Sequence, residues 1–165
     1  MTDNRTEEGK TVTDSAAEMV QIVLPNDTNM LGNLLGGTLM HWIDLVGAIT
    51  ANRHSRRPIV TASMEGLDFH VPIRLGHLVI LKARIHYAGK SSMEVGVEVF
   101  SENALTGERC HTSSAILTYV AVDTTGRPVA VPKLILTTDD EKQRWQEALA
   151  RKQKRLERLG RDPKP

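Results

Sequence analysis

Residues 29 to 51 read NMLGNLLGGTLMHWIDLVGAITA, a glycine-rich turn followed by an apolar segment. Between Gly37 and Asn52 every residue is apolar, small or neutral-polar except Asp44, with His41 as the only other titratable group. At about 100° per residue the large apolar side chains fall on one side of a helix, and the flanks are also apolar. We therefore predict a helix that protein covers on most of its surface.

Asp44 is the first candidate for a functional group in this helix, which we predict from about Gly37 to His54. A carboxylate among apolar neighbours is unfavourable unless it is paired, hydrated or used in chemistry. Two interpretations stay open at this stage. The aspartate either is satisfied by a neighbouring amide or a partner chain, or it acts as a base.

The glycine turn before the helix offers a possible partner for that base. Gly32, Gly36 and Gly37 permit backbone conformations and close approaches that a Cβ would forbid. The turn leaves N–H groups at the positive end of the helix, where they can hold a carbonyl oxygen that gains charge. Asn33 lies within the turn and offers a donor and an acceptor. It either takes part in chemistry or caps the start of the helix.

The whole chain has the size and charge of one ordinary domain. It has 165 residues and a formal net charge of +1, which argues against broad binding to nucleic acid or to an anionic membrane. Cys110 is the only cysteine, and no HxH, HExxH or carboxylate cluster predicts a metal site. No apolar run reaches the length of a membrane span, and the N-terminus lacks a signal-peptide core. We expect a cytoplasmic protein without a metal.

The chain divides into three parts in this interpretation. Residues 1–15 are polar and predict a disordered tail, residues 16–136 a single domain, and residues 137–165 a C-terminal helix with a frayed end. Thr138 followed by Glu141 resembles a capping box and places the last helix at about Asp139 to Leu159.

Five segments of the central part alternate apolar and polar residues or are rich in β-branched ones. They are Met19–Leu24, Ile59–Phe69, Gly76–Tyr87, Ser92–Glu102 and Arg109–Val122. Because short turns join the last four, they predict an antiparallel sheet curled around the helix, an α+β fold. Such a sheet leaves an edge strand and an outer face to cover, so we expect self-association.

Several pieces, in this order, resemble one family. They are PNDTNMLGNLLGGTLMHWID, NRH, IVTASMEGLDFHVPIRLG, AGKSSMEVGVEVFSEN and TYVAVD followed by a VPKL segment. Together they are similar to the hot-dog-fold acyl-CoA thioesterases, in the brain-type or cytosolic acyl-CoA hydrolase branch, over about residues 19 to 150. The resemblance implies an antiparallel sheet around a central helix, paired into a larger double sheet.

The resemblance also implies an activity, the hydrolysis of acyl-CoA to a free fatty acid and CoA. CoA is then part of substrate and product, and no separate cofactor is expected. The family's helix carboxylate falls on Asp44 and its turn asparagine on Asn33, with the Gly36 and Gly37 region polarising the carbonyl. Asp44 would activate a water or attack the thioester itself, and both routes stay open. Family members build each site between two protomers, which implies a dimer and, in close relatives, a hexamer of three dimers.

The same resemblance places CoA contacts near Lys90, Ser91 and Ser92, a basic turn rich in hydroxyl groups that suits phosphate. The alternative is an ordinary hairpin turn. The cluster of Arg53, His54, Arg56 and Arg57 is predicted to be a solvated loop.

His70 is predicted to pack or hydrogen-bond at a strand end. As an alternative to the hydrolase we consider a non-catalytic acyl-CoA sensor or carrier of the same fold. A hot-dog dehydratase is disfavoured because no Asp and His pair has the spacing that its chemistry uses.

Overall fold

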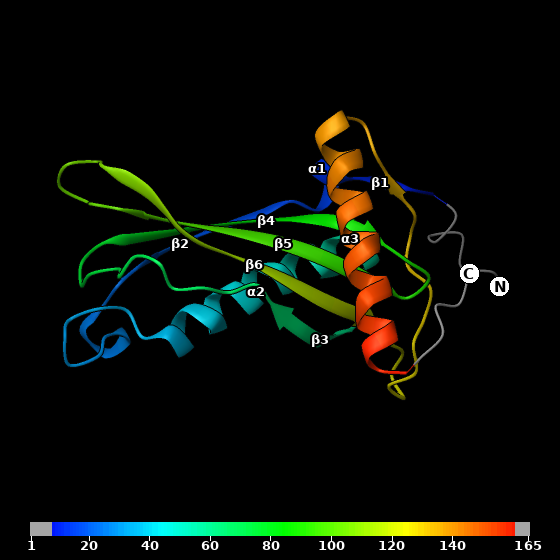
Figure 1. Cartoon of the computed structure of the whole chain (residues 1–165), viewed down its shortest axis with the longest axis horizontal. Helices are drawn as coiled ribbons and strands as arrows, with labels where there is room; N and C mark the ends of the chain where they lie inside the picture. The colour runs from blue at the N-terminus through cyan, green and yellow to red at the C-terminus, as the bar shows by residue number, and fades with distance from the viewer. Residues whose placement is uncertain (1–7, 161–165) are drawn as a thin grey trace.

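The computed structural model describes residues 8–160, which form one antiparallel sheet with a long helix on each face (Figure 1). The strand order is β2-β4-β5-β6-β3, and all four pairings are antiparallel. The strands are β2 (Ala17–Ile22), β3 (Ile59–Glu65), β4 (Leu78–Ala88), β5 (Ser92–Glu102) and β6 (Arg109–Ala121). The predicted α+β fold with about five strands is confirmed.

Helix α2 (Gly36–Ser55) packs on the inner face of the sheet. Alternate strand residues point toward it, because successive side chains of a strand lie on opposite faces. Val95, Val97 and Val99 of β5 are buried in the same apolar core as Ile43 and Val46 of the helix. The predicted helix is thus confirmed, one residue longer at each end.

One stripe of α2 remains uncovered, which corrects the prediction that protein covers most of the helix. Met40 and Leu45 each keep 43% of their surface, and Ile49 keeps 39%. Leu45 and Ile49 lie four residues apart on one side of Asp44, and Met40 lies one turn before Asp44 on the other side, so the three residues flank the carboxylate. The single chain therefore presents an apolar stripe beside Asp44.

Helix α3 (Asp139–Arg158) crosses the outer face of the sheet, on the near side in Figure 1. The predicted capping box is confirmed: the Thr138 hydroxyl accepts a hydrogen bond from the Glu141 amide. Arg151 of this helix makes two hydrogen bonds to the buried Glu94 of β5, at 2.6 and 3.2 Å. Charged pairs therefore hold the second helix in place.

The segment that precedes β2 is ordered, so the predicted disordered tail over residues 1–15 is wrong for residues 10–15. Strand β1 (Lys10–Thr11) pairs in parallel with β7 (Leu134–Ile135), and a short helix α1 (Val12–Ser15) follows. Val12 is buried in the core, which the polar composition of this stretch did not suggest. Residues 1–7 of the predicted tail and the predicted frayed end over 161–165 lie outside the described residues.

The remaining element bounds differ from the prediction by a few residues. Strand β2 begins and ends two residues earlier than predicted, and β5 has the predicted bounds. Strand β3 ends at Glu65 because Gly66 takes a positive φ of 72°, so the chain leaves the sheet before Phe69. Among the described helices none combines the length and hydropathy that crossing a membrane requires.

Candidate active site

Asp44 lies midway along α2 and is held by two hydroxyl groups from the sheet. The Thr61 hydroxyl donates a hydrogen bond to Oδ1 at 2.9 Å, and the Tyr119 hydroxyl lies 3.0 Å from the same oxygen. Tyr119 also reaches the main-chain oxygen of Asp44 at 3.0 Å. Within residues 8–160 no side chain or amide donates to Oδ2. The half-buried carboxylate is therefore fixed through one oxygen, while the other oxygen stays available.

The strands determine which side chains reach Asp44. Thr61 of β3 and Tyr119 of β6 are directly paired in the sheet, so their side chains lie on the same face. The register of β3 shifts between Thr61 and Ser63, and this bulge follows the residue that contacts the carboxylate. Burial, followed by the charge of Asp44 and the hydrogen bond to it, raises the pKa of Tyr119, so its hydroxyl keeps its proton and serves as a donor.

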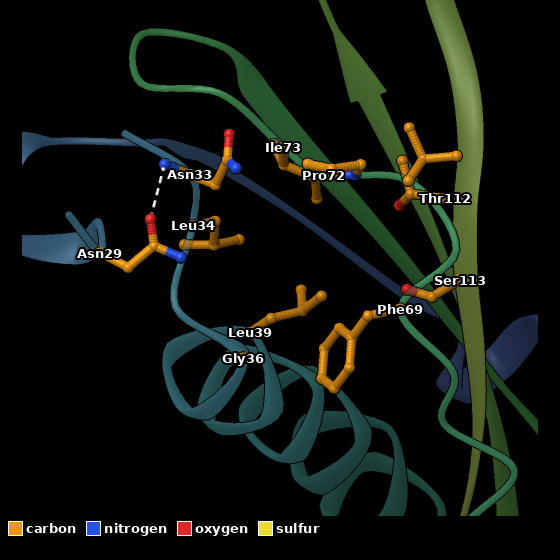
Figure 2. A pocket seen from close by; sticks show the side chains of 11 residues that line it. Asn29, Asn33, Leu34, Gly36, Leu39, Phe69, Pro72, Ile73, Thr112 and Ser113 are labelled. Carbon is orange, nitrogen blue, oxygen red and sulfur yellow. Dashed lines mark hydrogen bonds between the residues drawn. The ribbon is translucent and has the colours of Figure 1, made fainter. Parts of the chain in front are cut away.

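A pocket of about 270 Å³ opens at the N-terminus of α2 (Figure 2). Its lining is mostly apolar and comes from the glycine turn, the start of α2, the segment after β3 and the N-terminal part of β6. The lining residues are Asn29, Asn33, Leu34, Gly36, Leu39, Phe69, Val71, Pro72, Ile73, Thr112 and Ser113. The predicted site residues Asn33 and Gly36 thus share one concave surface.

The first turn of α2 has no side-chain cap. Leu35 occupies the N-cap position, so the interpretation of Asn33 as a helix cap is wrong. Leu39 is the first residue whose amide bonds back into the helix, to the Leu35 oxygen. In the described part of the chain the amides of Gly36 and Gly37 have no acceptor. Such amides at the positive end of a helix suit a negatively charged oxygen.

Asn29 is a pocket residue that the sequence reasoning missed. Its Oδ1 accepts hydrogen bonds from the amides of Leu31 and Asn33, at 2.9 and 3.2 Å, and so shapes the glycine turn (Figure 2). A side-chain amide oxygen that bonds an amide two residues later is typical of an Asx turn. An Asn at the start of a glycine-rich stretch could have indicated this role.

One chain does not bring Asp44 to the pocket. Gly37 and Asp44 are seven residues apart on a continuous helix, which is about 10 Å along its axis. Ser113 at the pocket and Tyr119 at the carboxylate are six residues apart on β6, or about 20 Å. The carboxylate and the uncapped helix end therefore lie apart within a single protomer.

The predicted CoA turn lies away from the pocket, at the other end of the sheet. Ser92 pairs with Val120, one residue beyond the Tyr119 row that contacts Asp44. The oxygens of Lys90 and Ser91 accept hydrogen bonds from Val131 and Ala121, so the turn is anchored to neighbouring segments. The turn is thus nearer to Asp44 than to the glycine turn of its own chain.

Two other predictions about charged residues are wrong. Arg53 and His54 belong to the last turn of α2 instead of a solvated loop, and His54 is fully buried with Nε2 2.8 Å from the Pro132 oxygen. His70 is exposed and lies 3.9 Å from Asp68, so it does not pack at a strand end. Across residues 8–160 no group of three metal-ligating side chains is assembled.

Comparison with known proteins places this geometry in a family. Residues 31–108 match the model of the thioesterase superfamily. The chain is 45% identical to the uncharacterized acyl-CoA thioester hydrolase YkhA of Bacillus subtilis over 119 residues, which is 72% of this chain and 69% of that protein. The chain belongs to the acyl-CoA thioester hydrolases of the thioesterase superfamily. The resemblance seen in the sequence is thereby confirmed.

Solved members of this superfamily have the same fold. An apo-hexameric acyl-CoA thioesterase superimposes with a TM-score of 0.87 at 39% identity, over 92% of this chain and 97% of that one. An acyl-CoA hydrolase from Staphylococcus aureus was solved with butyryl coenzyme A, coenzyme A and coenzyme A disulfide. It superimposes with a TM-score of 0.84 at 36% identity, over 92% of this chain and 93% of that one. The chain spans only 38% of the longer rat cytosolic acyl coenzyme A thioester hydrolase, at 35% identity.

Proposed function

We propose that this protein hydrolyses acyl-CoA to a free fatty acid and CoA, with Asp44 as general base or nucleophile. The observation that carries the proposal is the carboxylate itself. Oδ1 is held by Thr61 and Tyr119, and Oδ2 has no donor within the described chain. A base must be held in position and still have an oxygen available for the proton or the carbon it attacks.

The chemistry needs a second component that stabilises charge on the thioester oxygen. In the proposal the Gly36 and Gly37 amides polarise the carbonyl, and Asn33 at the rim of the pocket orients the water. In the first route Asp44 takes a proton from that water while the water oxygen bonds to the carbonyl carbon, the C–S bond breaks, and the thiolate of CoA leaves and takes up the proton. In the second route Asp44 bonds to the carbonyl carbon and displaces the thiolate, and water then hydrolyses the resulting anhydride to the free fatty acid and Asp44. Preorganised donors of this kind stabilise the transition state more than the substrate.

The two components come from different protomers in this proposal. About 10 Å of helix separates Gly37 from Asp44 within one chain, too far for both to act on a single carbonyl. The apolar stripe of Met40, Leu45 and Ile49 beside Asp44 gives a second copy a surface to cover. We propose a dimer with two shared sites, assembled further into a hexamer as a trimer of dimers. The hexameric solved relative supports this size.

The remaining parts of the substrate have proposed places as well. The apolar pocket at the helix end takes part of the acyl chain, since its lining is mostly aliphatic or aromatic. Lys90, Ser91 and Ser92 contact the phosphates of CoA, because this turn presents a cation and two hydroxyl groups near Asp44. The reaction needs no cofactor besides the CoA of the substrate, and we place it in the cytoplasm.

The test uses Asp44→Asn, which keeps the shape of the side chain and removes its basicity. Purified protein is incubated with acyl-CoAs of increasing chain length, and a thiol reagent follows CoA release. We expect turnover by the unaltered protein and a loss of about 10²- to 10⁴-fold in the variant, at unchanged oligomer size. Full activity in Asp44→Asn would refute the role of the carboxylate. Binding of acyl-CoA without CoA release by the unaltered protein would indicate a sensor or carrier.

A mixing experiment tests the shared site. Chains with Asp44→Asn are co-refolded with chains that carry Gly37→Pro, which lacks the amide donor. If sites form between protomers, one of the two sites in each mixed dimer is intact, and about a quarter of the full activity returns. If each protomer has its own complete site, mixing restores nothing.

A further inference from the structure

We propose that Tyr119 and Gly47 form a positioning device that fixes the orientation of the Asp44 carboxylate and leaves Oδ2 as its working oxygen. The proposal rests on the function proposed above, and it adds Gly47 and a specific positioning role for the Tyr119 hydroxyl. Neither residue lines the pocket.

Tyr119 is placed to hold Asp44 and nothing else. Its side chain is fully buried, so it cannot touch a substrate that arrives from solvent. Its hydroxyl lies 3.0 Å from Oδ1 and 3.0 Å from the main-chain oxygen of the same residue. One donor therefore ties the side chain of Asp44 to its own backbone, which limits rotation about the Cα–Cβ bond.

The sheet makes this donor rigid. Tyr119 lies within β6 and pairs with Met93 of β5 on one side and with Thr61 of β3 on the other. Thr61 donates to the same carboxylate oxygen. Two donors from adjacent strands thus converge on Oδ1, and neither can move without distorting the sheet.

Gly47 makes the close approach of Tyr119 possible. A Cβ at position 47 would lie 2.4 Å from the tyrosine oxygen and 3.2 Å from two of its ring carbons. Three residues separate Gly47 from Asp44, so both lie on the side of α2 that faces β6. Glycine is unfavourable inside a helix, and the close approach of Tyr119 explains its presence at position 47. Any larger residue would push the hydroxyl away from the carboxylate.

The surroundings contain few other charges that act on this contact. Asp44 is the charged group that acts on Tyr119, and burial together with Asp44 raises the pKa of the tyrosine. His41 is the other titratable side chain on this part of α2, and it is exposed. Removal of the Tyr119 hydroxyl should therefore be felt mainly by the ionised carboxylate.

The first test is Tyr119→Phe, which removes only the hydroxyl. The ionised carboxylate loses a donor, so we expect the acid limb of the pH–kcat profile to move up by about 0.5 to 1 unit. Below that limb kcat should fall about 3- to 10-fold, while KM stays the same because Tyr119 does not contact substrate. Tyr87→Phe is the matched control, because its hydroxyl faces Lys152 of α3 and not Asp44. It should leave the profile in place.

The second test uses Gly47→Ala alone and combined with Tyr119→Phe. The single variant should reproduce the shift of the pH profile, since its methyl group displaces the hydroxyl. In the double variant the hydroxyl that met the methyl group is gone, so the two effects should not add. Additive effects, or a Gly47→Ala enzyme with an unaltered profile, would overturn the proposal. If Tyr119→Phe does not fold, the profile of Gly47→Ala decides.

These outcomes separate the inference from the function on which it rests. If Asp44→Asn is fully active, the proposed function fails whatever Tyr119 does. If Asp44→Asn is inactive and Tyr119→Phe keeps the unaltered kcat and pH profile, only the positioning role fails. A merely structural effect would be excluded if Tyr119→Phe and Tyr87→Phe have equal melting temperatures and only Tyr119→Phe shifts the pH–kcat profile.

Discussion

Helices α2 and α3 each contain 20 residues and lie on opposite faces of the same sheet, yet they are built differently. The N-terminus of α3 is closed by the capping box of Thr138 and Glu141, whereas α2 begins without a side-chain cap in front of a pocket. Helix α3 has one buried residue, Ala148, and docks through ion pairs. Helix α2 is largely apolar and contributes nine residues to the buried interior.

Neighbouring residues of β6 show how the two faces differ. Thr118 points outward and accepts a hydrogen bond from Arg155 of α3 at 3.0 Å, while Tyr119 points inward to Asp44 of α2. Of the two helices, α3 is closed at its N-terminus and contributes to stability. The other keeps donors and a carboxylate oxygen unused by its own chain, as a proposed site requires.

The largest expected effect concerns the uncapped end of α2. Gly37→Pro removes one amide donor, and proline is tolerated in the first turn of a helix. If that amide polarises the thioester, kcat should fall by about 10²- to 10³-fold in the thiol-release assay. Gly37→Ala keeps the amide, and its Cβ meets no atom within 4 Å in the protomer. Its kcat should therefore fall far less than that of Gly37→Pro. Equal losses in both variants would remove the proposed role of the amide.

A smaller effect is expected on stability when the anchor of α3 is broken. Burial acts to raise the pKa of Glu94, but His86, whose Nδ1 lies 3.6 Å from Oε1, and the two hydrogen bonds from Arg151 outweigh it and hold the pKa below its ordinary value. Glu94→Gln leaves Arg151 without its counter-charge. Because the Arg151 side chain is 30% exposed, we expect the free energy of unfolding to fall by about 2 kcal/mol, less than for a fully buried pair.

Urea unfolding measures this loss, and Glu98→Gln is the matched control. Glu98 lies on the same strand and pairs with the exposed His111. The Glu98→Gln substitution should therefore lower the free energy of unfolding by no more than about 0.5 kcal/mol. CoA release by Glu94→Gln at low denaturant should remain close to normal. A variant that loses activity without losing stability would contradict the division of roles between the two helices.

The smallest expected effect is a pH dependence at the C-terminal end of α2. Burial lowers the pKa of His54, so the unfolded chain binds more protons than the folded one as the pH falls below about 6.5. Stability should therefore decrease by about 1 kcal/mol between pH 7 and pH 5.5. His54→Gln cannot take up a proton, and its unfolding curve should depend less on pH over this range. An unchanged slope in the variant would assign the effect to other groups.

Most of the fold could be predicted from the sequence because each element carries its own periodicity. The alternation over residues 92–102 gave β5 its bounds, and the apolar run around Asp44 predicted α2. The segment over residues 10–15 could not be predicted, because its order comes from pairing with residues 134–135, far along the chain. Local composition does not report such long-range pairing.

The site could be predicted only in part. Asp44 was detectable as an isolated charge, but its donors Thr61 and Tyr119 lie 17 and 75 residues away and become neighbours only through sheet register. Gly47 was not distinguishable from any other small helix residue without the ring that packs on it. The roles of Asn33, Gly36, Gly37 and the Lys90–Ser92 turn stay predictions, and the two Gly37 variants test the amide at that position.

The parallel pair of β1 and β7 has a consequence for how the molecule is made. Lys10 lies beside Leu134, so β1 has no strand partner until residues 134–135 have been synthesised. Contacts of such high sequence separation form late and slow the folding reaction. The end of α2 depends on the same late segment, because Nε2 of His54 lies 2.8 Å from the Pro132 oxygen. These contacts at the C-terminal end of α2 and at β1 can therefore form only after residues 132–135 have been synthesised.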